Sequence, residues 1–123
     1  MTALMQDPLI YALAFNIVVL APVLLALAFG RGAIDGAFGP DTPARRILAC
    51  IYLAIALASG ALIAFRLHGA AWTTIATLTL FAVQIAYKSG TVFAVGLRNP
   101  VVATNILVIV IQLAAVGLLL THA

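Results

Sequence analysis

The sequence predicts an all-α, polytopic membrane protein, in which four transmembrane helices form an antiparallel up-down bundle and residues 1–123 form one domain. Hydrophobic residues occupy 66% of the 123 positions and charged residues 7%, whereas soluble proteins are about half apolar and about a quarter charged. Four stretches are each apolar over about 20 residues, the length that crosses a ~30 Å hydrocarbon core. The lipid bilayer is therefore the expected surrounding of the chain.

The first two helices are expected over residues 8–29 and 43–65. Asp7-Pro8 and Thr42-Pro43 each place a capping side chain before a proline. The capping oxygen accepts a hydrogen bond from a free backbone N–H, and a proline at the first helical position has no N–H to leave unpaired. The first stretch is too long, and its start too poor in Lys and Arg, for a signal peptide. The connection between the two helices is either a plain loop or a short interfacial segment.

The third and fourth helices are expected over residues 69–88 and 100–121. Asn99-Pro100 again places a capping residue before a proline. The connection between the second and third helices is very short, so these two helices are expected to be antiparallel neighbours. The third helix is polar for a membrane segment.

Lys and Arg residues are divided unevenly between the two sides that this topology defines. The side with both termini carries only Arg66, whereas the first and third connections carry five: Arg31, Arg45, Arg46, Lys88 and Arg98. Because cytoplasmic loops are enriched in Lys and Arg, we expect both termini outside and the basic loops in the cytoplasm, in an inner or plasma membrane. The net charge of +3 is scattered, and it does not indicate nucleic-acid binding.

The third helix carries a polar stripe made of Thr73, Thr77, Gln84, Lys88 and Thr91, which fall within an arc of about 60° at ~100° per residue. One interpretation is a solute path with Lys88 at its cytoplasmic mouth. The other is an interhelical seam, in which the threonines bond their own helix, Gln84 bonds a neighbour and Lys88 extends to the lipid headgroups. We favour the seam, because a lysine at the end of a span reaches the headgroups at little cost.

Three more amide side chains lie in the other apolar stretches. Asn105 and Gln112 are seven residues apart and share one face of the fourth helix, and Asn16 lies within the first. An amide that faced lipid would lose its hydrogen bonds, so these faces are expected to point inward or toward a partner. The same two interpretations, path and seam, apply to them, with the same preference.

The second helix has small residues at four-residue spacing, Ala56, Gly60 and Ala64. Small residues at this spacing allow two helix backbones to approach closely in a membrane. We therefore interpret this face as a helix-packing surface.

No catalytic, cofactor-binding or metal-ligating residues are predicted. The chain has no glutamate, and its three aspartates lie outside the spans. A single cysteine excludes an intrachain disulfide, and the two histidines have no ligand-spaced partner. The expected function is that of a non-enzymatic accessory or stabilising subunit of a membrane complex, or of a homo-oligomer. The alternative is a small transporter or channel with a polar path along the third helix.

Overall fold

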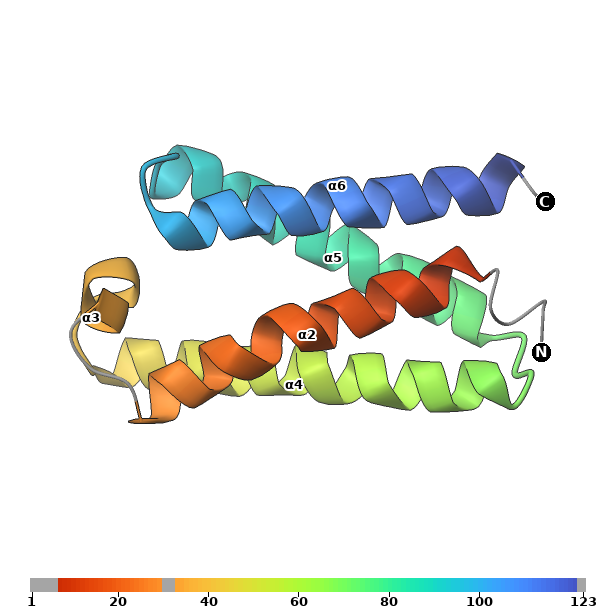
Figure 1. Ribbon diagram of the computed structural model, residues 1–123, viewed down its shortest axis with the longest axis horizontal. Helices are drawn as coiled ribbons and strands as arrows, with labels where there is room; N and C mark the ends of the chain where they lie inside the picture. The colour runs from red at the N-terminus through yellow and green to blue at the C-terminus, as the bar shows by residue number, and fades with distance from the viewer. Residues whose placement is uncertain (1–6, 30–32, 122–123) are drawn as a thin grey trace.

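The computed structural model describes residues 7–29 and 33–121, and within these ranges it contains helices and no strand. These residues form four long helices and one short one, whose arrangement Figure 1 shows. They are α2 (Pro8–Phe29), α3 (Ala33–Phe38), α4 (Pro43–Leu67), α5 (Thr73–Ala94) and α6 (Pro100–Thr121). The all-α prediction is confirmed for the described part of the chain.

Three of these helices, α2, α4 and α6, are long and apolar enough to cross a membrane. They are consistent with a multi-pass membrane protein. α5 is equally long but is not among the three, because its threonines, Gln84 and Lys88 lower its hydropathy. Of the four expected spans, three are supported by their length and hydropathy, and the fourth stays a prediction.

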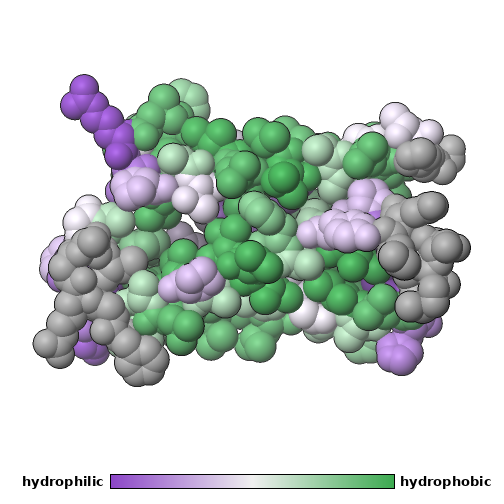
Figure 2. Space-filling view, viewed as in Figure 1, coloured by the Kyte–Doolittle hydropathy of each residue, from purple (hydrophilic) through white to green (hydrophobic). Residues whose placement is uncertain are grey.

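The surface of the described residues also fits lipid. Figure 2 shows a broad apolar band across the middle of one face, with hydrophilic residues toward the two ends. Large apolar side chains on every long helix are exposed, among them Val18, Ile75 and Leu120 at 67–74%. Apolar surface of this extent is uncommon on soluble proteins, where the largest patch is typically a few hundred Å².

The three capping predictions are confirmed by hydrogen bonds from the first turn of each helix. The bonds run from Leu9 N to Asp7 Oδ1 (3.1 Å), from Arg45 N to Thr42 Oγ1 (3.4 Å) and from Val101 N to Asn99 Oδ1 (2.8 Å).

The third helix differs most from its prediction. It spans residues 73–94 rather than 69–88. The chain turns at Gly69 (φ +81°) before it, and at Gly96 (φ +101°) after it, where a glycine accepts the left-handed backbone. Gly90, in contrast, lies inside the helix. Lys88 therefore lies six residues before the end of α5 and not at the end of the span.

The connection between α2 and α4 contains the six-residue helix α3. In Figure 1, α3 lies at the end of the molecule where α2 ends and where α4 and α6 begin. Its Phe38 ring meets the Tyr52 ring of α4 edge-on, with centroids 6.2 Å apart. The Asn99 amide donates to the Ala37 carbonyl at 2.8 Å and ties α3 to the start of α6.

The core consists of two apolar clusters with polar residues between them. The first contains Leu9, Ala12, Leu13, Leu62, Phe81 and Ala115, and the second contains Leu20, Tyr52 and Ile55. Asn16 lies between the clusters along α2, and Ser59 lies between them along α4. The bundle is thus layered, with a polar layer at its middle.

Candidate functional site

The middle layer is a cluster of three amides and one hydroxyl, contributed by the four long helices. Asn16, Ser59, Gln84 and Gln112 are each at most 1% exposed. The Gln84 Oε1 atom accepts from Asn16 Nδ2 at 2.9 Å and from Gln112 Nε2 at 2.7 Å. Asn16 Nδ2 also reaches Ser59 Oγ at 3.3 Å, and Gln112 Nε2 reaches Asn16 Oδ1 at 3.3 Å. These bonds connect α2, α4, α5 and α6 at one level.

The sequence predicted three members of this amide cluster and missed the fourth. Asn16, Gln84 and Gln112 were candidates, and the structure brings them together. Ser59 was not a candidate, although it is one of few polar residues in an apolar span, and that isolation was the available signal.

Among the described residues, the buried atoms without a hydrogen-bond partner include the Gln112 Oε1 atom in this layer. They also include the Thr77 hydroxyl, which lies about two turns from Gln84 along α5. Each has room for a further donor, since an amide oxygen and a hydroxyl oxygen each carry two lone pairs.

An ion pair closes one end of the bundle. Arg66, at the end of α4, donates to the Asp7 carboxylate that caps α2, with one contact at 3.2 Å. Its guanidinium also donates to Thr74 Oγ1 at 2.8 Å and Thr73 Oγ1 at 3.3 Å. Thr73 therefore bonds Arg66, and its hydroxyl also donates to the Ala70 carbonyl at 2.6 Å. Asp7 and Arg66 are 59 residues apart, and nothing local in the sequence pairs them.

Lys88 and Asn105 form a second polar contact toward the α3 end. Lys88 is 3% exposed, and its Nζ donates to Asn105 Oδ1 at 2.9 Å. The Asn105 amide donates in turn to Thr91 Oγ1 at 3.3 Å. The expectation that Lys88 extends to the headgroups is wrong, because α5 continues past it to Ala94 and keeps the ammonium inside the bundle.

The polar stripe of α5 is interrupted along its length. Phe81 lies between Thr77 and Gln84 on the same helix face, is 1% exposed, and packs with Leu13 and Leu62 of the first apolar cluster. The threonine end of the stripe is thereby separated from the amide cluster by apolar side chains.

The three small residues of α4 differ in their surroundings, and the helix-packing interpretation stays a prediction. A Cβ atom on Gly60 would meet Ile17 Cδ1 of α2 at 3.9 Å, an ordinary van der Waals distance. Ala64 is exposed, and Ala56 is partly buried against the second apolar cluster.

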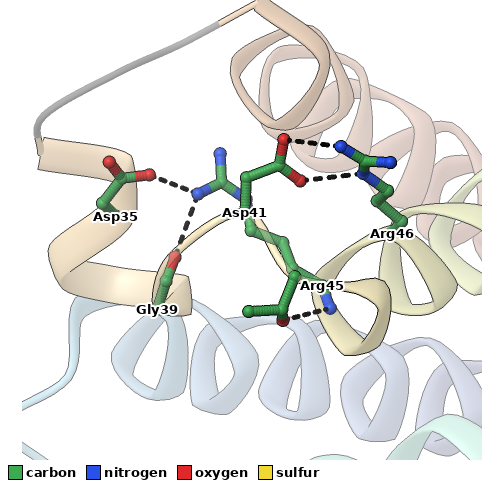
Figure 3. Close-up of polar contacts among 6 residues, drawn as sticks. Asp35, Gly39, Asp41, Arg45 and Arg46 are labelled. Carbon is green, nitrogen blue, oxygen red and sulfur yellow. Dashed lines mark hydrogen bonds and ion pairs between the residues drawn. The ribbon is translucent and has the colours of Figure 1, made fainter.

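Two further ion pairs surround α3, as Figure 3 shows. Arg45 donates to the Asp35 carboxylate and, at 2.9 Å, to the Gly39 carbonyl. Arg46 donates to both Asp41 oxygens, at 3.0 and 3.2 Å. The hydrogen bond from Arg46 holds the pKa of Asp41 below its usual range. Each of the three aspartates is thus paired with an arginine.

A cavity of about 290 Å³ lies beside Lys88. Lys88, Asn105 and Tyr52 line it together with residues of α2, α3 and the start of α6. Its other walls come from α2 (Val19, Leu20, Val23), from α3 (Ala37, Phe38) and from the first two turns of α6 (Pro100, Val101, Thr104), and most of these residues are apolar.

Among the described residues, no group of three or more His, Cys, Asp or Glu is placed to hold a metal ion. Cys50 is exposed, and His122 lies outside the described residues. Comparisons with protein-family models, with curated proteins and with solved structures find no match for this chain.

Proposed function

We propose that the protein is a non-enzymatic four-span membrane protein that acts as a stabilising subunit of a membrane complex or as a homo-oligomer. The observation that carries this proposal is the amide cluster at the centre of the bundle. Its hydrogen bonds join all four long helices, and apolar clusters lie on both sides of it. Such a layer fixes the arrangement of helices and leaves the middle of the bundle closed.

The fourth span of this proposal is α5. Its 22 residues measure about 33 Å at ~1.5 Å per residue, enough to cross the hydrocarbon core. Its polar side chains are buried, while Ile75 and Val83 on its outer face are 74% and 58% exposed. The four helices then alternate in direction, with both termini outside and the basic connections in the cytoplasm.

Cysteine labelling tests this topology. In a Cys50→Ser background, a cysteine at Val95 is expected to react with an impermeant reagent only from the cytoplasmic side. Cysteines at Ala70 and Thr121 are expected to react only from the outside. Labelling of Ala70 and Val95 from the same side would contradict α5 as a span.

The support for assembly with another membrane segment is the groove between α4 and α5. Three small side chains, Ala58, Ala61 and Ala76, line it among larger apolar residues. The Thr79 hydroxyl in the same groove donates to its own helix, to the Ile75 carbonyl at 2.8 Å. In membranes, small residues permit the close backbone approach that drives helix association.

Cross-linking tests assembly in native membranes. With Cys50 replaced by serine, oxidation of a cysteine at Ala61 is expected to give a disulfide-linked homodimer, or a mixed disulfide with a co-purifying subunit. The matched control is a cysteine at Leu113, which is exposed on α6. Absence of any adduct at Ala61, together with a monomeric mass after mild extraction, would refute the assembly proposal.

The second candidate function is transport along α5. Buried Lys88 beside a cavity, and the unpaired Thr77 hydroxyl nearer the other end, are the observations in its favour. A path needs hydrated walls, so cysteines at Thr73, Thr77 and Gln84 would react with small charged thiol reagents while Ile75 and Ala82 would not. The subunit proposal expects no reaction at any of the three.

A further inference from the structure

We infer that the cavity beside Lys88 binds an amphiphilic acid, a carboxylate or phosphate attached to an apolar chain. Lys88 would take the anionic head, and the walls formed by α2, α3 and α6 would take the apolar part. This inference concerns a ligand site at one end of the bundle and does not rest on the proposed subunit role.

The first argument is the charge on Lys88. The ammonium is 3% exposed, and a charge removed from water is costly unless an opposite charge or strong hydrogen bonds compensate it. Asn105 supplies one neutral acceptor at 2.9 Å, and the Tyr87 ring centroid lies 5.2 Å from Nζ. Neither provides the negative charge that normally accompanies a buried lysine in a membrane.

The chain has no carboxylate side chain left to supply that charge. It contains three acidic residues in all, and each is paired with an arginine: Asp7 with Arg66, Asp35 with Arg45 and Asp41 with Arg46. An anion from outside the chain would complete the pairing of Lys88.

The second argument is the space beside the ammonium. At about 290 Å³, the cavity is roughly twice the ~150 Å³ apolar cavity that takes up benzene in an engineered protein. Valine, leucine, phenylalanine and proline side chains form most of its lining, so it suits a hydrocarbon chain better than water.

The third argument is the start of α6. Pro100, Val101 and Thr104, in its first two turns, line the cavity, and the N-terminal end of a helix carries a partial positive charge. Asn99 caps this end and also holds α3 through the Ala37 carbonyl. The helix end therefore adds to the positive potential of Lys88, and α3 forms one wall of the cavity through Ala37 and Phe38.

The apolar wall on α2 suggests access from the bilayer. Val19 and Val23, both partly exposed, belong to the lining, and so does Val101 of α6. The acid would then be either an anionic membrane lipid or a free amphiphilic acid dissolved in the bilayer.

The test uses the full chain in phosphatidylcholine nanodiscs and measures binding with oleate. Oleyl alcohol has the same tail without the charge, and acetate has the charge without the tail. A hydrogen bond to a charged group is stronger than one between neutral groups, so oleate is expected to bind about tenfold or more tightly than oleyl alcohol. Acetate is expected not to bind measurably. Equal binding of oleate and oleyl alcohol would overturn the inference.

Two variants locate the site. Lys88→Met is expected to abolish the preference for oleate over oleyl alcohol, and Lys88→Arg to retain it. Val23→Trp fills the cavity without a change in charge and is expected to weaken oleate binding about tenfold or more. Its control is Val18→Trp on the lipid side of α2, where Val18 is 67% exposed. Unchanged oleate binding in both Lys88→Met and Val23→Trp would refute the site.

Native mass spectrometry separates the two sources of the acid. In nanodiscs with one third phosphatidylglycerol, retention of that lipid by the wild type but not by Lys88→Met would identify a lipid headgroup as the ligand. Retention of added oleate alone would identify a free acid. Retention of neither would refute the inference.

Discussion

Gln84 is expected to contribute more to the free energy of unfolding than any other single member of the amide cluster. Its Oε1 atom accepts from two donors, at 2.7 and 2.9 Å. Side-chain hydrogen bonds between membrane helices contribute ~0.6 kcal/mol on average and ~1.7 at most. Gln84→Leu removes both bonds, so we expect a loss of about 1–3 kcal/mol. The donors on Asn16 and Gln112 then keep only longer contacts, at 3.3 Å.

Reversible unfolding by sodium dodecyl sulfate in mixed micelles, followed by circular dichroism, measures this loss. Thr79→Val is the matched control, because the Thr79 hydroxyl lies on the exposed face of α5 and bonds its own helix. We expect that control to change the free energy of unfolding by less than about 0.5 kcal/mol. A Gln84→Leu variant as stable as the control would show that the amide cluster does not hold the helices together.

Simultaneous replacement of all three amides gives a second, independent result. Each single replacement leaves buried amides without a partner, which costs more free energy than the loss of the bond itself. The triple leucine variant of Asn16, Gln84 and Gln112 leaves no amide of the cluster unpaired. Its loss is expected to be clearly smaller than the sum of the three single losses, because the three residues share bonds. Additive losses would contradict a shared cluster.

Three further predictions concern the outer parts of the bundle. Gly60→Ala is expected to leave the thermal midpoint unchanged in detergent, because its new Cβ would meet only Ile17 Cδ1 at 3.9 Å, whereas Gly60→Leu displaces that side chain and lowers the midpoint. By NMR titration, the Asp41 carboxyl is expected to have a pKa below 3.8, and this pKa is expected to rise toward 3.8 in Arg46→Gln. Since the pKa is lower in the folded state, the pair with Arg46 stabilises the fold above pH 3.8. That stabilisation is lost as the pH falls through the folded-state pKa. Asn99→Ala removes a helix cap and a bond to α3, at a cost of about 1 kcal/mol, and is expected to speed hydrogen exchange in α3.

Local chemistry made the helix starts predictable. A capping residue before a proline needs only its own helix to act, and Asp7, Thr42 and Asn99 each form the expected bond. The end of α5 was less predictable, because both Gly90 and Gly96 are able to end a helix. Only the folded backbone shows that the left-handed turn falls at Gly96.

The faces of the candidate residues followed from helical period, but their partners did not. The spacing placed Gln84 and Lys88 on one face of α5, and both are buried. Gln84 bonds Asn16, 68 residues away in the sequence, and Gln112, 28 residues away. These contacts depend on how α5 packs with α2 and α6. The burial of Lys88 could not be predicted either, since it depends on six further residues of α5 and on the packing of α6 beside it.

The buried cations at the two ends of the bundle, Arg66 and Lys88, have different partners, and the last prediction follows from this difference. Arg66 pairs with the Asp7 carboxylate, and both side chains are 12–13% exposed. Arg66→Gln breaks this largely buried pair. It is expected to lower the free energy of unfolding by about 2 kcal/mol, between the values for surface and buried pairs. Lys88 meets no carboxylate among the described residues, so Lys88→Met removes a buried charge together with one neutral bond to Asn105.

In phosphatidylcholine nanodiscs without anionic lipid, Lys88→Met is therefore expected to be at least as stable as the wild type, while Arg66→Gln is less stable. Oleate is then expected to raise the stability of the wild type and of Arg66→Gln but not that of Lys88→Met, because a ligand stabilises only the folded state that binds it. If Lys88→Met and Arg66→Gln were destabilised equally without ligand, the charge on Lys88 would already be compensated within the bundle, and the argument for an external anion would fail.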